Sequence, residues 1–444
     1  MDLNKGQTSM KDILREIIYR FYTRSIPSLI TRSCHFPILE GRATVILGMR
    51  RTGKTYRCYQ RIKELIDSGI SQDRILYLNF EDERLKNFTL PDCQLILDVY
   101  YERYPQNRNV LCYFFFDEIQ NVKEWELFVR RIIDSEKIQI TITGSSSKML
   151  SKEMSSTMRG RSLSMEVLPF SLEEYLRFCG IFEKTPDYIS SVEKSQIMNC
   201  LNSYFIWGGI PEIQKMHEID RENALQDHYN LVVSRDVKER YKIANIEAVD
   251  EIANFIFNSI AERISISGIL KYLEERRIKT DWSTIKKYIT YLCDAYIFFP
   301  VHMEERSLAR QKRNPVKYYA IDIGLIRAMS INPTGDNGHL LENLVFIHLH
   351  RLGYQMTYVQ SQKTGREIDF YAYHPATKAK KLIQVSLKLN NPSTLAREVE
   401  AFKSAGEYLN TDEKLIVTWD EEGKLDNDIK VIPAWKFFLD YKTE

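Results

Sequence analysis

Short apolar runs alternate with helical patterns through the first third of the chain. Four runs have the length and composition of β-strands, and the third is almost continuously apolar, as expected for a strand covered on both faces. They lie at residues 43–48, 74–80, 109–116 and 138–143. Strands alternating with helices are typical of a parallel sheet with crossover helices. We therefore predict an α/β domain over residues 1–168, with helices on both faces of its sheet and a leading helical segment at residues 1–32.

The pattern then becomes helical. Residues 169–245 predict a helical lid or connector, interrupted by the stretch "WGGIPE". In that stretch Gly208 and Gly209 permit a tight turn, and Pro211 suits the first turn of the next helix. Asp236 lies among other charged residues, which predicts an ordinary solvated helix face.

Two further parts are predicted for the rest of the chain. Residues 246–320 contain a compact helical group whose last helix places Ile285, Ile289, Leu292 and Cys293 on one face. A basic, proline-containing stretch follows it and is typical of a loop or wing. Residues 321–444 begin with a helix and continue with strand-like runs. We expect a winged-helix-like domain followed by an α/β domain.

Composition narrows the class of protein. The 444 residues are too many for one hydrophobic core, and the proportions of hydrophobic (44%) and charged (27%) residues are those of a globular protein. The formal net charge of +2 does not point to a nucleic-acid partner, so any such surface must be local. No apolar run approaches the ~20 residues of a membrane helix, and the seven scattered cysteines fit a reducing compartment. We expect a cytoplasmic protein with no membrane partner.

The stretch "GMRRTGKT" at residues 48–55 matches the phosphate-binding pattern G-x-x-x-x-G-K-[ST]. The glycines let the backbone curl so that its N–H groups converge on a phosphate. Lys54 then reaches the β- and γ-phosphate oxygens, and Thr55 offers its hydroxyl to Mg²⁺. The side chains of Arg50 and Arg51 are expected to point outward. The candidate ATP-binding residues are Gly48, Met49, Arg50, Arg51, Thr52, Gly53, Lys54, Thr55 and Tyr56.

Two acids follow the third apolar run. Asp117 ends that run, at the carboxyl edge of the sheet, where open α/β folds bind ligands. We expect Asp117 to hold Mg²⁺ through a water, beside Thr55, and Glu118 to polarise the attacking water as general base.

Two further elements are candidates for contact with the γ-phosphate. The run ending at Thr143 is expected beside the Asp117 strand, so Thr143 or Ser145 is a candidate to bind the phosphate or the lytic water; a simple turn is the alternative. Arg161, in "RGRSLS", is a candidate to offset transition-state charge, with a surface ion pair as its alternative. If Arg161 acts in a neighbour's site, the active form is a homo-oligomer.

The order of these motifs resembles a family of prokaryotic ATPases that pair an AAA-type P-loop domain with a C-terminal domain of unknown function. Besides the phosphate loop, the resemblance is carried by "FFFDEIQNVKEWELFVRRIID", "ITGSSSKMLS", "GRSLSMEVLPFSLEEYL" and "YFIWGGIPE", and it continues through "LLENLVFIHLHRLGY". It implies ATP and Mg²⁺ as cofactors, hydrolysis by Asp117 and Glu118, Ser145 or a neighbour as sensor, and Arg161 as the family arginine.

The compact helical group carries a local excess of positive charge. Lys286 and Lys287 lie on the expected groove-entering helix, and Lys312 and Arg313 lie on the expected wing. Lys271, Arg276, Arg277, Lys279, Arg306, Arg310 and Lys317 add to it. This clustering is typical of contact with duplex DNA. Interspersed acids leave open a packing module or a protein-contact module.

The C-terminal part resembles the restriction-endonuclease-like fold, in which acids from a helix and two strands bind Mg²⁺ beside a lysine. Glu342 is the candidate helix acid, and Glu367 and Asp369 share one face of a strand. The next strand, which should carry an acid and a lysine, has Gln384 and Ser386 instead. We expect a nuclease-like fold without cleavage, or a Glu342 that only forms an ion pair.

Together these features predict a Mg²⁺-dependent ATPase that acts as a nucleotide-driven switch on DNA or a protein partner. The alternatives are an ATP-controlled nuclease effector and a nucleotide-sensing scaffold without turnover.

Overall fold

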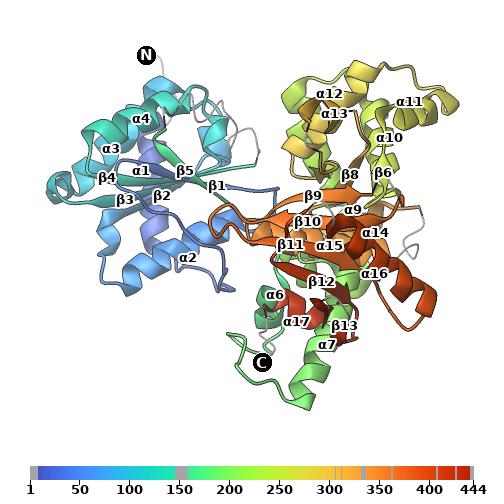
Figure 1. Ribbon diagram of the computed structural model, residues 1–444. Helices are drawn as coiled ribbons and strands as arrows, with labels where there is room; N and C mark the ends of the chain where they lie inside the picture. Colours follow the sequence, from blue (N-terminus) through green and yellow to red (C-terminus); the bar gives the residue numbers. More distant parts are fainter. Residues whose placement is uncertain are drawn as a thin grey trace, which may run out of the picture. The chain divides into compact units, whose positions relative to one another are not determined.

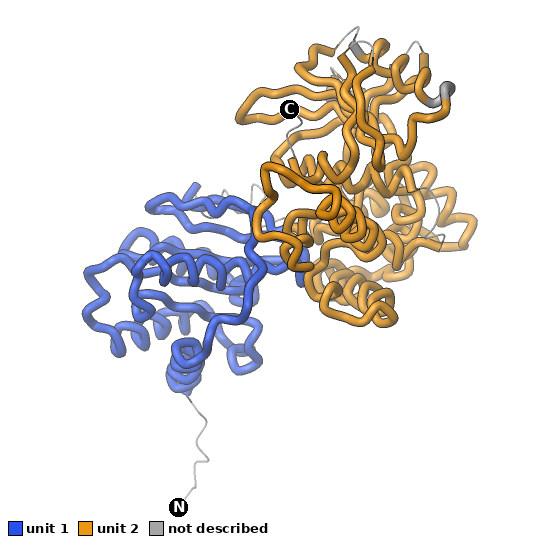
Figure 2. The backbone as a smooth tube through the Cα atoms, turned by 90° about the horizontal axis from the view of Figure 1, so that it is seen from below, with its two compact units in different colours: residues 1–167 blue, residues 168–444 orange. Residues whose placement is uncertain are grey.

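The computed structural model describes residues 9–145, 158, 160–305, 307–311, 313–331, 337–361, 364–406, 409–425 and 428–440. The chain divides into two compact units, Met1–Val167 and Leu168–Glu444, which Figure 2 colours separately. The finer division of the second unit stays a prediction.

The first unit is built on a five-stranded parallel sheet of order β2-β3-β4-β1-β5 (Figure 1). Its strands are β1 (Ala43–Leu47), β2 (Ile75–Asn79), β3 (Cys112–Asp117), β4 (Ile138–Gly144) and β5 (Ser162–Glu166). The first four coincide with the four predicted runs, so the predicted parallel α/β fold is confirmed. The fifth run is mixed in polarity and was not predicted.

Helices cover both faces of this sheet. The long ones are α1 (Met10–Thr23), α2 (Lys54–Asp67), α3 (Cys93–Arg103) and α4 (Trp125–Ser135). Adjacent side chains of a strand point to opposite faces, and β3 illustrates it. Phe115 packs in the cluster that contains Ile62 of α2, whereas Phe114 and Phe116 contact Tyr100 of α3 and Phe128 of α4 respectively.

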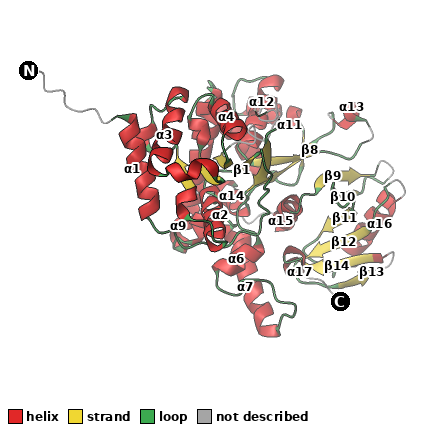
Figure 3. Cartoon of the chain, turned by 90° about the vertical axis from the view of Figure 1, so that its left-hand side faces the viewer, coloured by secondary structure: helices red, strands yellow, loops and turns green. Residues whose placement is uncertain are grey.

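The second unit begins with helices α6 (Leu172–Phe178), α7 (Ser191–Trp207), α8 (Pro211–Gln214) and α9 (Glu218–Val232), followed by a π-helix, η7 (Val233–Glu239) (Figure 3). Serine-to-glutamate capping boxes start α6 and α7, and α8 begins at Pro211 as expected. Asp236 does not lie on a solvated face: it is buried and forms an ion pair with Arg240 at 2.9 Å.

A three-stranded antiparallel sheet of order β6-β8-β7 comes next. Its strands are β6 (Arg263–Ile264), β7 (Phe298–Val301) and β8 (Val316–Ala320). The accompanying helices are α10 (Ile246–Phe257), α11 (Ile266–Glu275), α12 (Trp282–Asp294), α13 (Leu308–Gln311) and α14 (Ile323–Met329). The predicted apolar face of α12 is buried at Ile285, Ile289 and Leu292.

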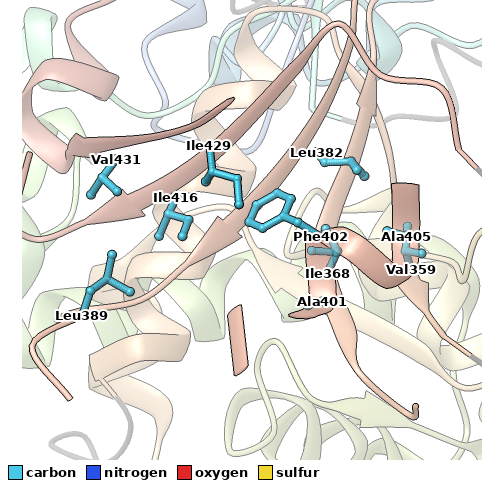
Figure 4. Close-up of a cluster of buried hydrophobic side chains, with 10 residues drawn as sticks. All are labelled: Val359, Ile368, Leu382, Leu389, Ala401, Phe402, Ala405, Ile416, Ile429 and Val431. Carbon is cyan, nitrogen blue, oxygen red and sulfur yellow. The ribbon is translucent and has the colours of Figure 1, made fainter. Parts of the chain in front are cut away.

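The chain ends in a six-stranded mixed sheet of order β13-β14-β12-β11-β10-β9. Its elements are α15 (Asn337–Arg351), β9 (Gln355–Gln360), β10 (Glu367–Tyr373), β11 (Lys380–Val385), α16 (Pro392–Gly406), β12 (Glu413–Thr418), β13 (Gly423–Leu425), β14 (Ile429–Pro433) and α17 (Ala434–Phe438). Phe402 of α16 packs on Ile368, Leu382, Ile416 and the other apolar side chains of one face of this sheet (Figure 4).

Within the described part of the chain, no helix has the length and apolar character needed to cross a bilayer.

Candidate nucleotide site and a second carboxylate cluster

The phosphate-loop motif connects β1 to α2, and its glycines are required by close approach and by backbone conformation. Gly48 has φ 149°, and a Cβ there would lie 2.3 Å from the carbonyl oxygen of Val167. Gly53 precedes α2 with φ 103°, and its Cβ would lie 2.9 Å from the Arg32 guanidinium. L-residues rarely adopt such φ values, so another residue at either position would be strained.

Hydrogen bonds inside the loop hold its curvature. The Thr52 hydroxyl donates to the Met49 carbonyl at 2.9 Å, and Arg32 donates to the Thr52 carbonyl at 2.8 Å. Met49 and Thr52 are buried, whereas Arg51 is exposed with φ 61°. Arg50 forms an ion pair with Glu81 at 2.8 Å. Tyr56, in the first turn of α2, is largely exposed.

Asp117 lies where the loop, β2, β3 and β4 meet. Its Oδ2 accepts hydrogen bonds from the hydroxyls of Thr55 and Tyr77, each at 2.7 Å, and its Oδ1 accepts one from Thr143. Two oxygens that ligate one octahedral Mg²⁺ at ~2.1 Å are about 3 Å apart. The Thr55–Asp117 separation is close to this value, so these two residues fit the expected ion.

Glu118 is next to Asp117 but meets a different partner. Its carboxylate lies 3.3 Å from the Lys54 ammonium, and both side chains are buried. Burial alone would raise the pKa of Glu118, but the charge of Lys54, a hydrogen bond from Gln120 and the charge of Arg50 outweigh burial and hold that pKa below its usual value. Glu118 is therefore an ionised carboxylate at neutral pH, as a water-activating base must be.

The structure brings Ser145 toward this edge of the sheet but not Arg161. Ser145 is buried directly after β4, whose Gly144 is level with Leu47 of β1. Arg161 precedes β5 at the opposite end, where its carbonyl accepts a hydrogen bond from the N–H of Ala43. A five-residue strand spans roughly 16 Å. Arg161 instead pairs with Asp134 at 3.1 Å.

A cavity of about 850 Å³ lies beside Thr55 and is lined by residues of α1, α2 and the segment after β2. Three tyrosines line it, Tyr56, Tyr59 and Tyr77. Tyr77 is a functional candidate that sequence reasoning missed. In the sequence, Tyr77 is marked only by a hydroxyl inside an apolar run; the position of β2 beside β3 is what brings that hydroxyl to Asp117.

A second cluster of carboxylates lies in the other unit. Glu342, Glu367 and Asp369 surround the ammonium of Lys317 at 2.9, 2.6 and 3.6 Å. Burial and the charge of Glu342 raise the pKa of Asp369 well above its usual value, although Lys317 opposes them. The Gln384 side chain accepts a hydrogen bond from the N–H of Asp369 at 3.2 Å. Lys317, the three acids and Gln384 line a cavity of about 550 Å³.

Ser386 is not part of this cluster. It is more exposed, and its hydroxyl donates to the Lys388 carbonyl at 3.1 Å. Lys317, which the sequence placed among DNA-facing charges, is 3% exposed and faces the three acids instead. That expectation is corrected by the position of β8, which carries the lysine into the interior.

The other candidate DNA contacts lie on the surface. Lys286, Lys287 and Arg313 are exposed, and the Lys286 ammonium lies 5.4 Å from the ring centre of the half-exposed Trp282. Arg306 and Lys312 fall outside the described residues.

Residues 40–176 match a family described as an AAA domain, and residues 198–335 match a domain of unknown function (DUF8612). Uncharacterized protein MJ1544 of Methanocaldococcus jannaschii is 34% identical over 427 residues, which cover 93% of this chain and 92% of that protein. This chain belongs to the MJ1544 family. Another relative, an uncharacterized protein of Haemophilus influenzae, is 29% identical over 350 residues, 78% of this chain and 82% of its own length.

The match of residues 40–176 to the AAA-domain family confirms the expected AAA-type P-loop domain. This member of the MJ1544 family is therefore a nucleotide-binding, ATPase-like protein. Among solved structures, the Aeropyrum pernix ORC1 protein in complex with DNA matches over 73% of this chain and 91% of its own, with 13% identity and a TM-score of 0.29. Cdc6p from Pyrobaculum aerophilum matches over 76% and 96%, with 12% identity and a TM-score of 0.26. Likeness this weak does not bear on what the chain binds. The nuclease-like fold of residues 321–444 stays a prediction.

Proposed function

We propose that the chain is a cytoplasmic, Mg²⁺-dependent ATPase that acts as a nucleotide-driven switch on duplex DNA or on a protein partner. The observation that carries the proposal is the pairing across one sheet edge of Thr55 with Asp117 and of Lys54 with Glu118. Those four side chains are the ones that an ATPase needs for metal, phosphate and water.

Each residue has a distinct task in this proposal. The loop N–H groups and the amino end of α2 receive the phosphates. Lys54 leaves Glu118 and pairs with the β- and γ-phosphates, which frees the carboxylate to orient and deprotonate a water. Thr55 and Asp117 hold Mg²⁺, which when bound would neutralise phosphate charge. The Thr143 hydroxyl is hydrogen-bonded to the Asp117 carboxylate and to the N–H of Glu118, so it holds both residues in position.

The deciding experiment measures ATP binding and phosphate release by the full chain, with and without duplex DNA. Lys54→Ala should abolish both, whereas Lys63→Ala, an exposed lysine on the same helix, should leave both unchanged. Wild-type protein that ignores ATP contradicts the proposal. Binding without any phosphate release would leave a nucleotide sensor rather than an ATPase.

The position of Arg161 ties its role to the oligomeric state. An Arg161 that acts on a phosphate has to come from a second copy, because its own strand starts at the far edge of the sheet. Mixing Arg161→Ala with Glu118→Gln should then restore activity, since one subunit supplies the arginine and the other the base. If Arg161→Ala alone retains full turnover, no phosphate depends on Arg161, and its role is the ion pair with Asp134.

Duplex DNA is the partner class favoured by the α12 surface. The arrangement of α10 to α12 with an antiparallel sheet of order β6-β8-β7 supports a winged-helix interpretation of this part. Lys286 and Lys287 lie exposed on α12, next to Trp282. DNA-stimulated turnover, lost when both lysines are replaced by alanine, is the expected outcome. Unchanged turnover and no measurable DNA binding would leave the protein-partner form of the switch.

A further inference from the structure

Lys317 is enclosed by acids from two elements of the second unit. It is 3% exposed, and its ammonium lies 2.9 Å from Glu342 of α15, 2.6 Å from Glu367 and 3.6 Å from Asp369, both of β10. The ammonium donates hydrogen bonds to Glu342 and Glu367, whereas Asp369, at 3.6 Å, is close enough for an ion pair but not for a hydrogen bond. The Tyr319 hydroxyl donates to the same Glu342 oxygen at 2.6 Å.

The ammonium lies where a carboxylate-bound cation would have to lie. Oxygens that ligate Mg²⁺ or Ca²⁺ are ~2.0–2.6 Å from the ion, so an ion shared by these acids would be only a few ångströms from the Lys317 nitrogen. Two cations that close repel strongly in a buried setting. With Lys317 in place, no group of three or more acidic, histidine or cysteine side chains among the described residues has an arrangement suited to a metal ion.

Two cations of the chain itself offset most of the negative charge of these three carboxylates. Arg263 adds a second cation 3.5 Å from Glu367. Burial would lower the pKa of Lys317, but the three carboxylates outweigh burial and raise it. Lys317 is therefore charged throughout the physiological range.

The lysine and the acids come from different sheets. Lys317 belongs to β8 of the three-stranded sheet, whereas Glu367 and Asp369 belong to β10 of the six-stranded sheet. We propose that Lys317 is a built-in counter-cation, which occupies the cation position of this cluster and fastens β8 to α15 and β10. The cluster thereby holds the two sheets together without a metal ion and is closed to nuclease chemistry.

The test compares thermal unfolding of the full chain in EDTA and in millimolar Mn²⁺, without nucleotide. Lys317→Met should lower the unfolding midpoint in EDTA by roughly 10 °C, because it leaves buried carboxylates without a cation. Mn²⁺ should recover much of that loss, since the vacated position is lined by acids. Lys430→Met, which removes a surface ion pair with Glu413, should show neither effect.

Two further measurements keep the test decisive if Lys317→Met does not fold. The double variant Lys317→Met/Glu342→Gln, which removes a cation and a carboxylate together, should yield more folded protein than Lys317→Met. Wild-type Mn²⁺ binding, measured by electron paramagnetic resonance, should be identical in Glu342→Gln. Mn²⁺ binding that Glu342→Gln removes, or a Lys317→Met protein as stable in EDTA as wild type, overturns the proposal.

Discussion

Lys54 and Lys317 are both buried lysines beside carboxylates, one in each compact unit, but their surroundings differ. Lys54 meets one carboxylate, Glu118 at 3.3 Å, and the Met49 carbonyl at 3.2 Å. Lys317 meets three carboxylates. A lysine with one exchangeable partner can turn to an incoming phosphate, whereas a lysine held by three acids cannot be released at a comparable cost. We therefore expect the number of neighbouring acids to distinguish a lysine that binds a ligand from a lysine with a structural role.

The largest effect is expected when the acid that pairs with Lys54 is replaced. Glu118→Gln should lower the rate of phosphate release by about 10²–10⁴-fold while ATP binding persists, because glutamine keeps the shape but cannot accept a proton. Turnover is measured at saturating ATP, and binding by fluorescent-nucleotide titration. Glu126→Gln, on α4, serves as the matched control. Loss of binding in Glu118→Gln would mean that the acid organises the loop rather than the water.

The two lysines are expected to differ in how much stability is lost when each is replaced. Lys317→Met should lower the free energy of unfolding by about 3–5 kcal/mol, and Lys54→Met by clearly less, because Glu118 lies at a sheet edge and can gain a proton or solvent. Chemical denaturation of both variants without nucleotide measures this difference. Equal losses would show that Lys317 has no special structural role.

Asp322 is a buried acid that forms no ion pair with a described residue, so it shows how burial acts on a carboxylate without a neighbouring lysine. Asp322 accepts hydrogen bonds from the N–H groups of Gly209 at 2.7 Å and Gly324 at 2.9 Å, and burial raises its pKa to about 6. Its folded-state pKa exceeds the ordinary 3.8, so the folded state binds more protons, and its contribution to stability falls as pH rises from about 4 to 6.

The stability difference between wild type and Asp322→Asn should therefore shrink over that pH window by up to ~3 kcal/mol, since a shift of one pKa unit corresponds to about 1.4 kcal/mol. Denaturation series at pH 4, 5, 6 and 7 measure it. A difference that is constant with pH would mean that Asp322 titrates normally.

The smallest effect is expected when the exposed lysines of α12 are replaced. Replacing Lys286 and Lys287 by alanine should weaken binding of duplex DNA of any sequence, and should reduce the dependence of log affinity on log salt by about 2, roughly one unit per lost phosphate contact. Fluorescence anisotropy between 50 and 200 mM salt is the measurement. Alanine at the exposed Lys63 and Lys403 is the matched control. An unchanged slope would exclude α12 from the DNA contact.

The positions of the candidate nucleotide-site residues could be predicted because the motifs that carry them are local in the sequence. The loop motif and the acids after β3 are read from short stretches, and the parallel sheet brings their ends together. Tyr77 was not predictable as an Asp117 partner, because that contact depends on β2 lying beside β3. The prediction placed Lys317 on the surface for the same reason. A lysine in a basic stretch is expected to be exposed, and only the packing of β8 against α15 and β10 buries it.

Paired glycines are commonly regarded as hinges, but Gly208 and Gly209 cannot serve as one. The Asp322 carboxylate fills the space beside them, so closely that a Cβ on Gly208 would lie 1.9 Å from its oxygen. Helix α7, the turn after it and the start of α14 are therefore held together by close packing and by the hydrogen bonds of Asp322. Any nucleotide-dependent rearrangement within Leu168–Glu444 would carry these segments as a single rigid piece, and the bending would have to occur elsewhere.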